Sequence, residues 1–130
     1  MKILLDTNVL IWLLSDPEQV GKQAIDVIQA AEQRSVSIVS QFEVAIKQRL
    51  GRIDLLETLE SEMNRQLIYQ IPLNIQQFNR LAKLKNVRHR DPFDLLIIAL
   101  AIEQGLTLIT SDRKILAMNL PGLVTVDASK

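Results

Sequence analysis

The sequence predicts an α/β fold in which a parallel sheet is covered by helices on both faces. Short apolar runs that suit buried strands alternate along the chain with longer segments of helical period. Of the 130 residues, 48% are hydrophobic, which is enough for one well-packed core in a chain of this length. Residues 1–130 are therefore expected to form a single domain.

The first three elements are a strand and two helices. The segment 2–5, in which three apolar residues follow Lys2, is typical of a short buried strand, and a helix is expected at 8–14 after it. An Asp-Pro pair suits a helix cap and first turn, so the next helix is expected at 16–33, with Gly21 as its weak point.

The middle of the chain begins with a second strand at 36–39. Ser40 is expected to cap the helix at 40–50, which Gly51 closes. A further amphipathic helix is expected at 55–67.

The last part of the chain repeats the alternation of strands and helices. A strand at 68–71 is stopped by Pro72, and Asn74 caps the helix after it. An Asp-Pro pair begins the most apolar helix, and Gly105 ends it. Helices are thus expected at 75–85, 92–104 and 112–118, and strands at 106–110 and 123–126.

Charge and cysteine content exclude several classes of protein. Lys plus Arg equals Asp plus Glu at 15 each, so a strongly basic surface is excluded as a global property, although a local patch remains possible. Without cysteine, the chain has no disulfide, thiolate metal site or cysteine nucleophile. No signal peptide is visible, and no apolar run approaches the ~20 residues of a membrane span. We therefore expect a cytoplasmic protein with no membrane contact.

Four acidic residues lie where an apolar run ends or a helix begins. They are Asp6, Glu43, Asp94 and Asp112. In an open α/β sheet, strand ends and the following helix starts meet at one crevice, so these carboxylates are expected to converge there. Converging carboxylates repel one another unless a cation lies between them, and Mg²⁺ and Mn²⁺ prefer carboxylate oxygens. The pattern predicts a metal-dependent enzyme that acts on phosphate esters.

Each acid also has a local explanation. Ser40 and Glu43 have the spacing of a capping box, and Asp112 can cap the short helix after its strand. Asp91 is interpreted as the cap of the apolar helix, which leaves Asp94 as the candidate ligand. Asp6 is harder to explain in this way, because it directly follows a buried strand and an unpaired buried carboxylate is costly.

Polar and basic neighbours extend the candidate site. Short polar side chains beside the acids could hold a carboxylate or a metal-bound water, or could cap helices locally; they are Thr7, Asn8 and Ser111. Basic side chains near the acids could contact a polynucleotide backbone, or could simply be solvated; the candidates are Lys47, Arg52, Arg90 and Arg113. Lys47 could also pair with Glu43 one helical turn away.

The ordered set of motifs resembles the PIN domain, and most closely the VapC-type ribonuclease toxins of prokaryotic toxin–antitoxin pairs. The motifs are Leu4-Leu5-Asp6-Thr7-Asn8, Ser40-x-x-Glu43-x-x-x-Lys47-x-x-x-Gly51-Arg52, His89-Arg90-Asp91-Pro92-Phe93-Asp94 and Gly105-Leu106-Thr107-Leu108-Ile109-Thr110-Ser111-Asp112.

The resemblance implies a three-layer α/β/α sandwich and Mg²⁺- or Mn²⁺-dependent cleavage of single-stranded RNA. It also implies a homodimer and a cognate antitoxin protein that covers the active site. On the matching positions, the metal-binding and catalytic roles fall to Asp6, Glu43, Asp94 and Asp112.

Three positions depart from the family pattern. Phe42 stands where close relatives often have Trp, while Leu95 and Leu100 replace an Arg and a Gln that many members carry. The missing Arg leaves open an alternative, a catalytically inactive PIN-like module that binds a partner. Metal titration separates the two, because such a module would show no saturable Mn²⁺ binding that depends on Asp94.

Overall fold

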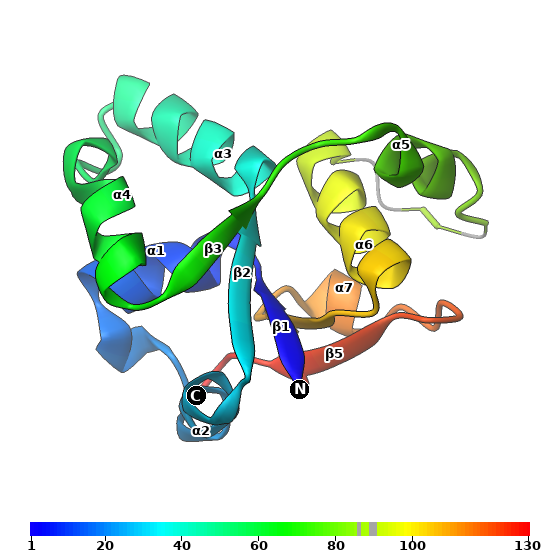
Figure 1. The fold of residues 1–130 in the computed structure, drawn as a ribbon, viewed down its shortest axis with the longest axis horizontal. Helices are drawn as coiled ribbons and strands as arrows, with labels where there is room; N and C mark the ends of the chain where they lie inside the picture. Colours follow the sequence, from blue (N-terminus) through cyan, green and yellow to red (C-terminus); the bar gives the residue numbers. More distant parts are fainter. Residues whose placement is uncertain (86, 89–90) are drawn as a thin grey trace.

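The computed structural model contains one five-stranded sheet in which every pair of neighbouring strands is parallel (Figure 1). It describes residues 1–85, 87–88 and 91–130. The strands are β1 (Lys2–Leu5), β2 (Gln33–Ser37), β3 (Ile68–Ile71), β4 (Thr107–Thr110) and β5 (Val124–Asp127), in the order β3-β2-β1-β4-β5. The order reverses beside β1, since the chain continues outward from β1 to β2 and β3 and then returns to β4 on the other side. Ligands of such sheets bind at this reversal, beyond the carboxyl ends of the strands.

Helices cover both faces of the sheet. They are α1 (Thr7–Ser15), α2 (Lys22–Ala30), α3 (Ile38–Arg49), α4 (Leu56–Arg65), α5 (Ile75–Ala82), α6 (Pro92–Gln104) and α7 (Arg113–Leu116), with a 3₁₀ turn at Pro17–Gln19. Figure 1 shows α1, α2 and α4 on one side of the sheet and α5, α6 and α7 on the other.

Alternating side chains of β1 divide the core into two clusters. Ile3 and Leu5 point into a cluster with α1, α2 and α4, whereas Leu4 points into a second cluster with α6 and α7. Successive residues of a strand face opposite sides of the sheet, and here both sides are fully buried. The predicted three-layer α/β/α sandwich with a central parallel sheet is therefore confirmed.

The helix predicted at 16–33 is wrong, because the chain breaks at Gly21 into a 3₁₀ turn and α2. The amide of Gly21 donates to the carbonyl of Ala128 at 2.8 Å, and a Cβ at Gly21 would lie 2.2 Å from the carbonyl oxygen of Ser129. Contact with the end of the chain, which no local pattern reveals, thus fixes the break at this glycine.

The second strand and the third helix both begin earlier than predicted. The strand is at Gln33–Ser37 instead of 36–39, and Ser37 rather than Ser40 caps α3, its Oγ accepting from the amide of Val39 at 3.0 Å. The start of this strand was missed because its first three side chains are polar, which does not suit a buried strand. Ser35 is nevertheless fully buried, and its hydroxyl donates to the carbonyl of Ile3 at 2.7 Å. The remaining elements lie within three residues of their predicted bounds.

The helix α6 begins and ends as predicted. The side chain of Asp91 caps it, Pro92 is its first residue, and Gly105 follows in the left-handed conformation at φ 64°. The helix is apolar nearly all round because it packs between the sheet and α5. Among the described residues, no helix is both long and apolar enough to cross a membrane.

Candidate functional site

Asp6 lies directly after β1, at the point where the strand order reverses. Its side chain is 7% exposed, and each of its oxygens accepts a hydrogen bond. The amide of Thr7 donates to Oδ1 at 2.8 Å, and the hydroxyl of Thr110 donates to Oδ2 at 2.7 Å. Its own amide donates to the carbonyl of Ile109 at 3.0 Å, which ties the end of β1 to the end of β4. The carboxylate is thus held in one orientation at the carboxyl edge of the sheet.

Glu43 reaches the same region from the second turn of α3. The hydroxyl of Thr7 donates to its Oε1 at 2.6 Å, and the hydroxyl of Ser40 lies 2.9 Å from that of Thr7. A hydroxyl carries one proton, so Ser40 donates to Thr7 while Thr7 donates to Glu43. The expected capping box is therefore wrong: Ser37 holds the cap position, and both Ser40 and Glu43 are available to the site.

Asp112 caps α7 and is joined to Asp6 through one hydroxyl group. Its Oδ1 accepts from the amides of Lys114 at 2.8 Å and Ile115 at 3.2 Å, as the capping interpretation expected. Its amide donates at 3.1 Å to the hydroxyl of Thr110, the same group that donates to Asp6. Its second oxygen, Oδ2, accepts no hydrogen bond from the residues that the structure describes, so one lone-pair face of this carboxylate is open.

Asp91 caps α6, as the sequence predicted, and Asp94 lies in the first turn of the same helix. Asp91 Oδ1 accepts from the amides of Phe93 at 2.9 Å and Asp94 at 3.2 Å, as a helix cap does. Asp94 lies in the first turn of α6 and lines the pocket beside it. The ring of Phe93 packs edge-on against Phe42 at 5.4 Å between centroids, which joins the helices that carry Asp94 and Glu43.

Burial and repulsion between acids both raise the pKa values of Asp6 and Glu43. Burial raises the pKa of Asp6, the hydrogen bonds from Thr110 and Thr7 oppose that rise, and repulsion from Asp112 and Asp91 adds to it. Burial likewise raises the pKa of Glu43, Thr7 opposes the rise, and Asp94, Asp6 and Asp91 add to it. Every member of the predicted set thus acts on at least one other member.

The donor chemistry fits a hard divalent cation, because oxygen ligands from carboxylates that repel one another gain most from a positive charge between them. Among the described side chains, however, no three acids stand close enough together to hold a metal ion as they are. Asp94 and Asp112 line the open pocket, whereas Asp6 is buried and neither it nor Glu43 lines the pocket. A cation held by all four acids would require their side chains to move closer together.

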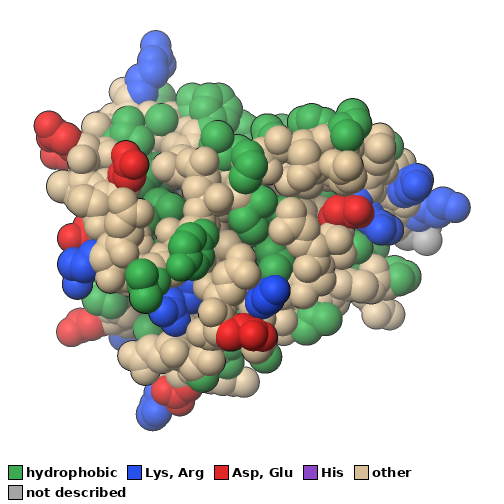
Figure 2. All heavy atoms as spheres, in the orientation of Figure 1, with side chains coloured by type: hydrophobic (Ala, Val, Ile, Leu, Met, Phe, Trp, Pro, Cys, Tyr) green, Lys and Arg blue, Asp and Glu red, His purple; other side chains and the backbone are tan. Residues whose placement is uncertain are grey.

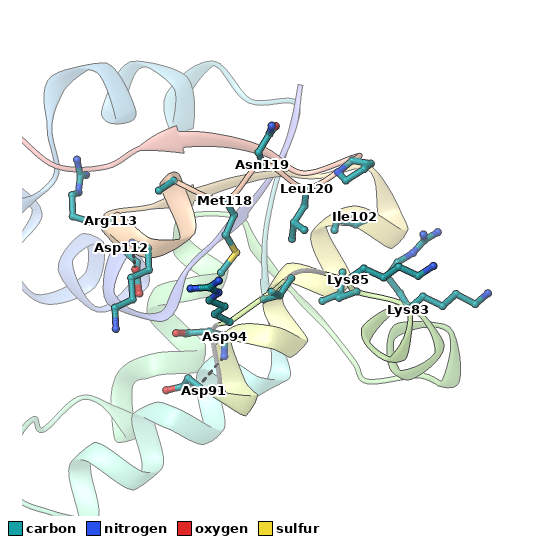
Figure 3. A pocket seen from close by; sticks show the side chains of 17 residues that line it. Lys83, Lys85, Asp91, Asp94, Ile102, Asp112, Arg113, Met118, Asn119 and Leu120 are labelled. Carbon is teal, nitrogen blue, oxygen red and sulfur yellow. Dashed lines mark hydrogen bonds between the residues drawn. The ribbon is translucent and has the colours of Figure 1, made fainter.

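A pocket of about 1620 Å³ opens beside these acids, between the α5–α6 connection and α7 with the loop that follows it. Figure 3 shows Asp91, Asp94 and Asp112 gathered at one side of it. Its wall also carries six basic side chains. The described lining residues are Arg80, Lys83, Leu84, Lys85, Val87, Arg88, Asp91, Asp94, Ile102, Asp112, Arg113, Lys114, Ala117, Met118, Asn119, Leu120 and Pro121.

The predicted basic residues are not all near the pocket. Arg113 lines it and pairs with Asp127, whereas Lys47 and Arg52 do not line it. Lys47 forms no ion pair with Glu43 in the described structure, so the helical pair considered from the sequence is absent there. Arg90 lies outside the described residues.

The three polar neighbours differ in what they contact. Thr7 contacts Glu43 directly, while the side chain of Asn8 is exposed and that of Ser111 forms no hydrogen bond with another described residue. Sequence reasoning missed Thr110, which links two of the acids. Thr110 could have been recognised in the sequence as a polar residue at the end of a mostly apolar strand, two positions before Asp112.

Comparison with known proteins gives three kinds of match. A family model described as the PIN domain matches residues 3–119. Ribonuclease VapC22 of Mycobacterium tuberculosis is 29% identical over 126 residues, which are 95% of this chain and 97% of that protein. A chain of a toxin-antitoxin complex from Klebsiella pneumoniae is 26% identical with a TM-score of 0.68, covering 95% of this chain and 97% of that one.

A more distant solved structure shares the fold. It is VapBC2 from Rickettsia felis, bound to a DNA fragment from its promoter, with a TM-score of 0.73 at 16% identity. The match covers 99% of this chain and 100% of that one. At this identity the likeness concerns the arrangement of strands and helices.

Proposed function

The chain belongs to the PIN domain family, and on that premise we propose that it is a Mg²⁺- or Mn²⁺-dependent endoribonuclease that cleaves single-stranded RNA. The observation that carries the proposal is that Thr110 links Asp6 to Asp112 and Thr7 links Asp6 to Glu43, while Asp94 lines the pocket beside them. The similarity to a ribonuclease over nearly the whole chain supports the same activity.

In the proposed mechanism, Asp6, Glu43, Asp94 and Asp112 would hold the divalent cation. A cation bound there supplies positive charge for the scissile phosphate and makes water a better nucleophile. Thr110 fixes the orientation of Asp6, and Thr7 fixes that of Glu43 through Oε1. Because the pKa of Glu43 is raised by burial, its Oε2 is suited to take up the proton released when water attacks the phosphorus.

A cleavage assay tests the activity. We expect the protein with Mg²⁺ or Mn²⁺ to cut single-stranded RNA and to leave a DNA strand and an RNA duplex of the same sequence intact. Mapping the products then identifies the cleaved bond and shows whether a sequence is preferred. Equal cutting of RNA and DNA would contradict the substrate assignment, and an absence of cutting with either metal would contradict the nuclease.

An antitoxin protein is the partner that we propose. A chain of a toxin-antitoxin complex from Klebsiella pneumoniae is similar to this chain over nearly its whole length, which supports a toxin role. In that role, a cognate antitoxin would cover the acids and their pocket and keep the nuclease inactive.

We also propose that the protein is a homodimer. Three apolar residues of α3 and the residue that caps its end repeat every four positions, so they form one stripe along the helix, and each is at least 37% exposed. The stripe consists of Ile38, Phe42, Ile46 and Leu50. Figure 2 shows hydrophobic side chains gathered along α3 and the start of α5, where Ile75 is 62% exposed. A patch of this kind is typical of a protein–protein interface.

Ile46→Glu is expected to break the dimer, because a charge would be buried there without a partner. Light scattering after size exclusion should then give the 14.7 kDa of one chain instead of twice that mass. Val124→Glu is the matched control, since Val124 is an exposed hydrophobic residue on the edge strand β5. A parent protein that is already monomeric, or an Ile46→Glu variant that stays dimeric, would contradict this interface.

A further inference from the structure

The chain is neutral as a whole, but its positive charge is concentrated on the walls of the pocket. No Asp or Glu occurs between Glu62 and Asp91, and four basic side chains of this stretch line the pocket. These four are Arg80, Lys83, Lys85 and Arg88. Arg113 and Lys114 of α7 stand on the other wall. A neutral protein therefore presents a strongly basic groove.

Four of these six basic side chains have no ion pair or hydrogen bond with another described residue. Arg80 pairs with Glu103 at 3.0 Å, and Arg113 pairs with Asp127. Within the described part of the chain, none of the other four side chains forms an ion pair or hydrogen bond; they are Lys83, Lys85, Arg88 and Lys114. All four are exposed. Uncompensated cations that line a groove attract a polyanion.

The groove has an apolar floor and an acidic end. Apolar side chains of the connection, of α6 and of the loop after α7 line it between the charged walls; they are Leu84, Val87, Ile102, Met118 and Leu120. In Figure 3, Asp91, Asp94 and Asp112 lie at one side of this floor, and Lys83 and Lys85 extend at the other. The acids thus lie at one side of the apolar floor, with Arg113 beside Asp112, and the lysines of the α5–α6 connection lie at the other side.

We propose that this groove is the binding track for the single-stranded RNA substrate. The phosphates contact Lys83, Lys85 and Arg88 on one wall and Lys114 on the other, the bases lie on the apolar floor, and the scissile phosphate reaches the acids. The inference rests on the proposed function and names residues that bind the RNA away from the cleaved bond. Unpaired bases can cover an apolar floor, whereas a duplex keeps its bases stacked inside.

An acidic protein segment is the other polyanion that the cations could attract. At the acidic end, its carboxylates and the phosphates of RNA would both meet Asp91, Asp94 and Asp112, so the difference lies in the apolar floor, on which unpaired bases can lie. For RNA, the same end is the place where its phosphate is cleaved. The arrangement therefore favours RNA over an acidic peptide.

The test is the affinity of a short fluorescent single-stranded RNA for the Lys83→Glu/Lys85→Glu variant, measured by anisotropy in EDTA over a range of KCl concentrations. We expect a Kd at least about tenfold higher than that of the parent, and a salt slope smaller by about 1.4, because each lost phosphate contact removes about 0.7 from the slope for a single strand. Lys2→Glu/Lys22→Glu is the matched control, since it makes the same change in net charge at two exposed lysines outside the pocket. Its Kd should stay near that of the parent.

The outcomes separate this inference from the proposed function. If the parent cleaves RNA and the Lys83→Glu/Lys85→Glu variant keeps both the parental Kd and the parental KM, the binding track is wrong and the nuclease stands. If the parent binds RNA through these lysines but never cleaves it, the nuclease is wrong and the track stands. A parent that binds no RNA, or that binds polyglutamate more tightly than RNA through the same two lysines, overturns the track.

Discussion

Asp6→Asn is expected to abolish RNA cleavage while the protein remains folded. Asn keeps the size of Asp and can still accept the hydrogen bond from the amide of Thr7, but it removes the negative charge that holds the cation. Loss of residues that merely orient metal ligands costs about 10–100-fold, so loss of a ligand should cost more than about 100-fold. Rates of single-stranded RNA cleavage, with circular dichroism as the folding control, measure both effects.

The same substitution is expected to stabilise the metal-free protein. Burial raises the pKa of Asp6 above its ordinary value of 3.8, so the charged form is less stable in the folded protein than in the unfolded chain. The contribution of this group to stability is therefore full below its unfolded pKa and is lost as the pH rises through its raised folded pKa. Asp6→Asn removes the penalty at neutral pH. Its gain in Tm over the parent should shrink as the pH falls through the raised folded pKa and should be absent below the unfolded pKa.

Asp26→Asn is the control for both measurements. Asp26 is exposed on α2 and pairs with Lys22 at the surface, so its loss should leave the cleavage rate unchanged and the Tm nearly unchanged. An Asp6→Asn protein that cut RNA as fast as the parent would show that Asp6 has no part in the reaction.

The position of the candidate site follows from patterns that are local in the sequence. Asp6 and Asp112 each come just after a buried strand, and the carboxyl ends of parallel strands meet at one edge, so their convergence was predictable without coordinates. Asp94 was separable from Asp91 because an Asp before Pro at a helix start is a cap. Rules of strand order and helix capping are sufficient for these residues.

Features that depend on contacts between distant segments were not predictable. Ser40 has the spacing of a cap in the sequence, but in the folded protein it is buried and hydrogen-bonds to Thr7. Gly21 is required by the carbonyl of Ser129, which comes from the other end of the chain. The basic groove likewise forms when the connection after α5 comes to lie opposite α7.

The two apolar departures from the family pattern differ in their surroundings. Leu100 is fully buried in the cluster formed by α6 and the sheet, where an apolar side chain packs without cost. Leu95 is partly buried in the second turn of α6, next to Asp94. The fold thus accommodates Leu100 as a core residue, whereas Leu95 stands beside an acid of the candidate site.

Removal of divalent metal is expected to stop cleavage completely. The pKa values of Asp6 and Glu43 are raised mainly by burial, and repulsion from neighbouring acids adds to the rise. Without a cation these acids would also repel the phosphate, so the apoprotein should neither bind the scissile phosphate nor activate water. EDTA should abolish cleavage, and Mn²⁺ or Mg²⁺ in excess should restore it. Cleavage that persists in EDTA at the parental rate would contradict a metal-dependent reaction.

The most direct test of whether the four acids hold a cation is a titration of Mn²⁺ into the protein. Binding is measured as the decrease in the electron spin resonance signal of free Mn²⁺. The parent should bind Mn²⁺ saturably, and Asp94→Asn/Asp112→Asn should abolish saturable binding, while Asp54→Asn, which alters an exposed acid outside the site, should bind as the parent does. A parent that binds no Mn²⁺ saturably would instead indicate a catalytically inactive binding module. A double variant that binds Mn²⁺ as tightly as the parent would contradict the assignment of these acids as ligands.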